Sequence, residues 1–169
     1  MEGEIVNRVS QSKLVTFDLE EHYPQGKRIV FDLKDWLFEG LVLREKDFRD
    51  KAKNHDWQQY EGTYVSLTCS SDAIIPGWAY MLISTYLSPV TRKVVIGSPE
   101  DLETILFKEI IDKLDVSALK DLPVIIKGCS HKPVPQNAYI MLLEKLIPIA
   151  RSIMYGEACS SVPLYKRKK

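Results

Sequence analysis

The three cysteines of this chain are the residues best suited by type and context to a chemical role. Each one directly precedes a serine, in Cys69-Ser70, Cys129-Ser130 and Cys159-Ser160. Thiolates are strong ligands for zinc and for iron–sulfur clusters. No two cysteines form a C-x-x-C knuckle, so the fold would have to bring them together. We therefore predict one metal-thiolate site, at which three Cys-Ser turns converge.

A tetrahedral zinc site needs a fourth ligand, and two polar residues near the cysteines are candidates. Asp72 follows Cys69 closely, and His131 follows Cys129. Asp72 could instead cap the following helix, and His131 could be a surface histidine. An open fourth position would make the site reactive or suited to cluster transfer.

Two other functions are compatible with these residues. Cys129 could be the nucleophile of a cysteine-dependent enzyme, with its pKa lowered at a helix N-terminus and with His131 as base. Residues two apart in a turn seldom reach each other with useful geometry, however. Alternatively, the protein could bind a partner without any metal. Aromatic residues are enriched at interface hot spots, although they are also common in cores. The candidates are Trp36, Phe38, Trp57, Trp78 and the segment from Tyr155 to Tyr165.

Length and composition limit the class of protein. A chain of 169 residues with 45% hydrophobic and 27% charged residues is typical of one globular domain. The 23 basic and 23 acidic residues balance, which argues against a nucleic-acid-binding domain. No apolar run is long enough to cross a membrane, and the polar start is not a signal peptide. We therefore expect a cytoplasmic protein, in which cysteines are free, metal-bound or catalytic.

The apolar pattern predicts an α/β fold in a single domain spanning residues 1–169. An N-terminal arm (1–12) precedes a strand and helix extension, and then three strand-turn-helix units follow. These units imply one central, mostly parallel sheet, whose strand ends would place Cys69 and Cys129 at a shared edge. Pro135 should open a last helix with a kink at Pro148 and a stop near Gly156. Residues 160–169 lack periodicity and are expected to form a C-terminal tail.

Several runs of the chain also carry a family resemblance, namely Phe31–Gly40, Leu43–Arg49, Asn54–Trp57, Thr68–Ser70, Lys127–Ser130, Lys132–Pro135 and Ser152–Ser160. They resemble a bacterial family defined as a domain of unknown function, and the resemblance covers nearly the whole chain. Members are often encoded beside genes of the SUF iron–sulfur assembly system. The resemblance implies that Cys69, Cys129 and Cys159 are motif cysteines and that SUF assembly proteins are partners. We therefore predict a zinc- or iron–sulfur-binding accessory protein rather than an enzyme.

Overall fold

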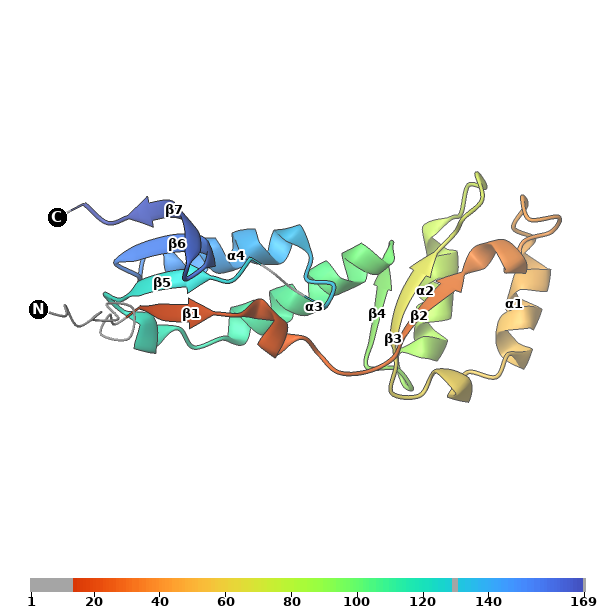
Figure 1. The fold of residues 1–169 in the computed structure, drawn as a ribbon. Helices are drawn as coiled ribbons and strands as arrows, with labels where there is room; N and C mark the ends of the chain where they lie inside the picture. The colour runs from red at the N-terminus through yellow and green to blue at the C-terminus, as the bar shows by residue number, and fades with distance from the viewer. Residues whose placement is uncertain (1–13, 129–130, 169) are drawn as a thin grey trace, which may run out of the picture. The chain divides into compact units, whose positions relative to one another are not determined.

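The structure is a computed structural model that describes residues 14–128 and 131–168. The chain folds into two compact units (Figure 1). Unit 1 combines Met1–Tyr23 with Leu106–Lys169, and unit 2 is the continuous segment Pro24–Ile105. Unit 2 is therefore inserted into unit 1 after its first strand.

Unit 2 contains a parallel sheet in the order β2-β3-β4. Its strands are β2 (Arg28–Asp32), β3 (Tyr64–Thr68) and β4 (Lys93–Ile96). Helices α1 (Glu45–Asn54) and α2 (Gly77–Leu87) make the two crossovers. Because both connections advance in the same direction, right-handed crossovers place both helices on one face of the sheet.

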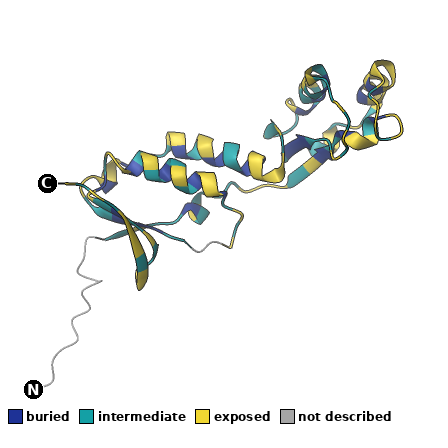
Figure 2. Ribbon diagram, turned by 90° about the horizontal axis from the view of Figure 1, so that it is seen from above, coloured by how far each residue is buried: buried dark blue, intermediate teal, exposed yellow. Residues whose placement is uncertain are grey.

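Unit 1 contains a sheet in the order β1-β5-β6-β7, in which only β7 is antiparallel. Its strands are β1 (Val15–Phe17), β5 (Pro123–Ile126), β6 (Ser152–Glu157) and β7 (Ser160–Lys166). Helix α4 (Gln136–Leu146) connects β5 to β6, and α3 (Pro99–Lys113) leads from β4 toward β5. Figure 2 shows buried residues alternating with exposed ones along these helices, as expected for helices with one apolar face.

Each unit has its own hydrophobic core. In unit 2, Phe48 of α1 and Leu87 of α2 pack with strand residues and are fully buried. In unit 1, Phe107 of α3 and Leu146 of α4 are buried in the same way. No helix in the described part of the chain has the length and apolar character that a membrane crossing requires.

The two units are an internal repeat in sequence. Residues 59 positions apart correspond over most of their length without gaps, as these pairs show: Phe48 and Phe107, Pro76 and Pro135, Ala79 and Ala138, Leu87 and Leu146, Pro89 and Pro148, Arg92 and Arg151, Gly97 and Gly156. One insertion at Gly128, followed by a one-residue deletion before Pro135, brings Cys69 into correspondence with Cys129. The first strands correspond as Phe17-Asp18-Leu19 and Phe31-Asp32-Leu33.

Backbone hydrogen bonds repeat along with the sequence. The amide of Gly62 donates to the carbonyl of Val90 at 2.9 Å, and that of Asp121 donates to the carbonyl of Ile149 at 3.0 Å. Gly62 and Asp121 also share a left-handed backbone, with φ of 66° and 60°. Strand registers agree as well, since Val65 lies opposite Val94 and its counterpart Val124 opposite Ile153. The two units therefore share one architecture, to which unit 1 adds β7.

The predicted α/β class with mostly parallel strands is confirmed, but two sheets replace the single central one. β5 does not join β3 and β4; it pairs with β1, more than a hundred residues earlier in the chain. The expected edge shared by Cys69 and the residues after β5 therefore does not exist within one sheet. Local patterns predict strands well but contain no information about which strand lies beside which.

The C-terminal region also differs from the prediction. α4 ends at Leu146, and Pro148 lies in the turn after it instead of kinking a longer helix. Gly156 lies inside β6, and residues 160–166 of the expected tail form β7. The apolar residues after Pro148 fit helical spacing by coincidence, whereas proline prevents the helix from continuing. The N-terminal arm predicted for 1–12 lies outside the described residues.

Candidate functional site

Three parallel strands of unit 1 end at one edge of its sheet, which we call the strand-end site. Asp18 directly follows β1, Lys127 and Gly128 follow β5, and Glu157 ends β6. Because neighbouring parallel strands run in the same direction, these residues lie side by side. Open α/β sheets bind ligands beyond the carboxyl ends of their strands. Cys129 is the next residue after Gly128 and lies outside the described residues.

An ion pair holds β1 and β5 together at this edge. Lys127 Nζ donates to Asp18 Oδ2 at 2.6 Å, while Asp18 Oδ1 accepts from the amide of Glu20 at 2.9 Å. Burial raises the pKa of the Asp18 carboxyl, but the bonds from Lys127 and Glu20 together outweigh it, so the pKa is lowered. The pKa of the Lys127 ammonium is raised, and the hydrogen bond to Asp18 is the main cause. The Lys127–Asp18 ion pair therefore fixes the end of β5, two residues before Cys129 in the sequence.

Gly128 allows the segment before Cys129 to lie against β6. A Cβ atom at this position would lie 2.9 Å from Cζ of Tyr155, so a larger residue would displace the tyrosine ring. The Tyr155 hydroxyl donates to the Gly128 carbonyl at 3.3 Å. The pairing of β5 with β6 ends at Ile126 opposite Tyr155, two residues before Gly128 and Glu157. Cys159 is exposed in the two-residue turn that follows Glu157.

The segment after Cys129 is attached to the same edge by Glu20. The amide of His131 donates to Glu20 Oε2 at 3.0 Å, and Lys132 Nζ donates to the Glu20 carbonyl at 3.4 Å. The His131 side chain is exposed. Two of the predicted metal ligands, His131 and Cys159, therefore both lie in unit 1, near the same edge of its sheet.

The other two predicted ligands belong to unit 2. Cys69 is half-buried just after β3, with its Sγ 3.3 Å from Ser71 Oγ. Asp72 is exposed in the bend that follows, and it does not cap α2, whose N-cap is Pro76. Within the ranges 14–128 and 131–168, no three His, Cys, Asp or Glu side chains are grouped so that they could hold a metal.

The Cys69 turn has an aspartate anchor that sequence reasoning missed. Asp32 Oδ1 accepts from the amide of Ser70 at 3.0 Å and from that of Lys34 at 2.9 Å. Burial raises the pKa of the Asp32 carboxyl, but the hydrogen bonds from Ser70 and Lys34 together outweigh burial. The pKa of Asp32 is therefore lowered. Asp18 occupies the equivalent position in unit 1. The repeated Phe-Asp-Leu triplets are the signal that could have identified both aspartates.

The tryptophans considered as partner surfaces mainly contribute to the core of unit 2. Trp36, Trp57 and Trp78 are half-buried and pack against its core cluster. His55 lies among these rings, with its centroid 4.6 Å from that of Trp57 and 5.2 Å from that of Trp36. Its Nε2 lies 2.9 Å from the Tyr60 hydroxyl.

The packing of His55 predicts a pH-dependent stability of unit 2. Burial lowers the pKa of His55, and the nearby Asp56 carboxylate only partly opposes this. The unfolded chain therefore binds a proton at higher pH than the folded one, so stability is full above the unfolded pKa of about 6.5 and falls as pH drops through it. Urea unfolding followed by tryptophan fluorescence between pH 7.5 and 5 should show this loss.

Two substitutions identify the histidine responsible. His55→Gln should flatten the pH dependence, whereas His22→Gln, on the other unit, should leave it unchanged. Equal slopes for wild type and His55→Gln would contradict the assignment.

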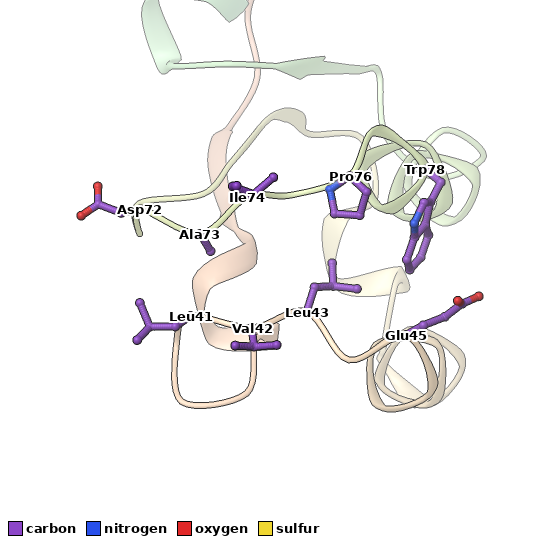
Figure 3. Close-up of a pocket in the computed structure, with 9 residues that line it drawn as sticks. All are labelled: Leu41, Val42, Leu43, Glu45, Asp72, Ala73, Ile74, Pro76 and Trp78. Carbon is purple, nitrogen blue, oxygen red and sulfur yellow. The ribbon is translucent and has the colours of Figure 1, made fainter.

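Unit 2 also carries an apolar groove between two loops. Leu41, Val42 and Leu43 form one side, and Ala73, Ile74 and Pro76 form the other. The acidic Asp72 lies at one end, and Trp78 and Glu45 lie at the other (Figure 3). Ile74 is 94% exposed and Leu41 is 61% exposed. Large apolar side chains exposed together are typical of protein–protein contact sites.

Comparisons with known proteins identify a family but no activity. Neither the search of curated proteins nor the search of solved structures returns a match. The family model described as "Protein of unknown function (DUF2480)" matches residues 3–167, and the chain therefore belongs to the DUF2480 family.

Proposed function

We propose that this protein is an accessory protein that binds a thiophilic metal ion or an iron–sulfur cluster through Cys129 and Cys159. The observation that supports this most is the placement of β5 and β6 side by side in unit 1. Gly128, which precedes Cys129, packs on Tyr155, and Glu157 ends β6 two residues before Cys159. Two cysteines thus follow adjacent strand ends of one sheet.

The side chains around this edge fit such a ligand chemically. Exposed Cys159 is open to an incoming ion, and the Lys127–Asp18 ion pair fixes the strand end that leads to Cys129. The side chains of His131 and Glu157 are further candidate metal ligands on the same edge of the sheet. When bound, zinc would be a structural or Lewis-acid centre, whereas a cluster would be cargo or a redox group. The resemblance to proteins encoded beside SUF genes favours a role in cluster assembly or transfer.

The experiment is elemental and sulfide analysis of protein purified without oxygen, together with an absorption spectrum. We expect about one zinc, or iron with sulfide, per chain in wild type, and near-complete loss in Cys129→Ser and in Cys159→Ser, because structural thiolate sites need each ligand. Cys69→Ser is the matched control from the repeat and should keep the metal. Folded wild type without metal would refute the proposal.

A second function is supported by the apolar groove of unit 2, which fits a metal-free interaction protein. Its exposed residues Leu41 and Ile74 lie on separate loops that form the two sides of one groove. If wild type is metal-free, Leu41→Asp should weaken binding to a protein partner. Rapid alkylation of Cys129 in the same metal-free protein would instead favour the cysteine-dependent enzyme.

A further inference from the structure

The outer edge of β4 in unit 2 has no strand beside it in the described part of the chain. β4 is the last strand in the order β2-β3-β4. The amide of Gly97 donates to the carbonyl of Leu67 at 3.0 Å, so it points toward β3. Because successive backbone amides of a strand alternate in direction, those of Val94 and Ile96 point away from β3. This edge therefore presents backbone groups outward.

The equivalent edge in unit 1 is occupied. β6 corresponds to β4 in the repeat, and it pairs with β7 in antiparallel direction from Ser152 opposite Lys166 to Glu157 opposite Ser160. The two units diverge directly after the corresponding glycines, Gly97 and Gly156. Unit 1 turns back into β7, whereas unit 2 enters α3. The same strand geometry thus accepts an antiparallel neighbour in one unit and lacks it in the other.

The β4 edge has fewer protecting features than β7, since its one lysine, Lys93, lies at its start and no proline follows. β4 contains no proline, and Val94, Val95 and Ile96 are apolar, with Ile96 57% exposed. By contrast β7, the outer strand of unit 1, contains Pro163 and ends in Lys166. Natural proteins use prolines and lysines to prevent pairing at sheet edges. After Lys93 the β4 edge is apolar and has no proline, which favours the addition of a strand.

We propose that the β4 edge binds an extended segment of another polypeptide, which adds antiparallel to β4 as β7 adds to β6. β7 indicates the chemistry of the occupant, because its Val162 and Leu164 are apolar and exposed, whereas Ser161 and Tyr165 are half-buried. The bound segment should differ from β7 at one position, the one equivalent to Lys166. Lys93 corresponds to Ser152, which lies opposite Lys166, and like charges opposite each other are destabilising. The segment therefore carries an acidic residue opposite Lys93.

The probe is a fluorescent peptide with the sequence of residues 160–168 and Lys166→Glu, titrated with the full chain and followed by anisotropy. Saturable binding of one peptide per chain is expected. Ile96→Pro removes an outward amide at an edge position where proline is tolerated, and it should weaken binding about tenfold, as for one lost hydrogen bond. Ile96→Thr retains the amide and should bind within about threefold of wild type.

Three results would overturn the proposal. These are absence of saturable binding, equal binding to Ile96→Pro, and a wild-type dimer that Ile96→Pro converts to monomer in sedimentation equilibrium. The second would arise if the peptide displaced β7 from β6, and the third would assign the edge to a second copy of the chain. If Ile96→Pro does not fold, a probe with methylated backbone amides tests the same bonds, and unweakened binding would likewise refute the proposal. None of these outcomes depends on a metal.

Discussion

Phe107→Ala is expected to lower the free energy of unfolding by about 3–5 kcal/mol, the range for removing a buried phenylalanine ring from a packed core. Phe107 is fully buried between α3 and the unit 1 sheet, where it packs with Leu142 and Leu146 of α4. Its ring also lies 6.2 Å from that of Tyr23. Because the helices cover one face of a small sheet, few neighbouring side chains could move into the cavity that the substitution leaves.

The repeat supplies a matched substitution, Phe48→Ala, with a separate readout. All three tryptophans lie in unit 2, so tryptophan fluorescence reports on that unit, whereas circular dichroism reports on both. Phe48→Ala should shift the fluorescence transition in urea by a similar free energy. Phe107→Ala should shift the circular dichroism signal, and it shifts fluorescence only if the units unfold together. Losses below about 1 kcal/mol for both would contradict the assigned cores.

Gly156→Ala is expected to destabilise unit 1 by about 3 kcal/mol, through backbone strain and overpacking together. Gly156 has φ of 123°, which side-chain-bearing residues rarely adopt, and a Cβ atom would lie 2.5 Å from the carbonyl oxygen of Ser160. Since that oxygen belongs to the backbone of β7, the clash can be relieved only by opening the hairpin that carries Cys159. The same variant should therefore also lower the metal content.

Gly62→Asn is the control for this substitution. Gly62 has φ of 66°, and a Cβ atom there would meet nothing within 4 Å. Asp121 occupies the corresponding position with φ of 60°, so the fold already accepts a side chain of this size. Urea unfolding should show a change below about 1 kcal/mol, since asparagine tolerates this conformation. Equal stabilities of Gly156→Ala and wild type would show that the hairpin is held differently.

Sequence patterns predicted most elements but not their assembly. The strands at β2, β3, β4 and β5 and the starts of α2, α3 and α4 all follow from apolar periodicity and from prolines at helix starts. The pairing of β1 with β5 depends on contacts between segments about a hundred residues apart, which no local pattern contains. The internal repeat could have indicated this pairing, because the triplets Phe17-Asp18-Leu19 and Phe31-Asp32-Leu33 each lie at the end of the first strand of a three-stranded parallel layer.

The candidate site was only partly predictable for the same reason. Similar Cys-Ser turns drew attention to Cys69 and Cys129, and the repeat explains that similarity by equivalent positions in two units. Cys159 has no counterpart, since it lies in the hairpin that only unit 1 possesses. The importance of Asp18 and Asp32 became evident only from their hydrogen bonds to the segments around the turns.

X-ray absorption spectroscopy at the metal edge, on protein purified without oxygen, tests the central claim most directly. The account predicts at least two sulfur ligands at about 2.3 Å from zinc, or the sulfide-rich shell of an iron–sulfur cluster. The spectrum of Cys69→Ser should match that of wild type, and Cys159→Ser should show almost no bound metal at the same edge. A metal bound only by oxygen and nitrogen, or one unaffected by Cys159→Ser, would contradict a site built on the strand ends of β5 and β6.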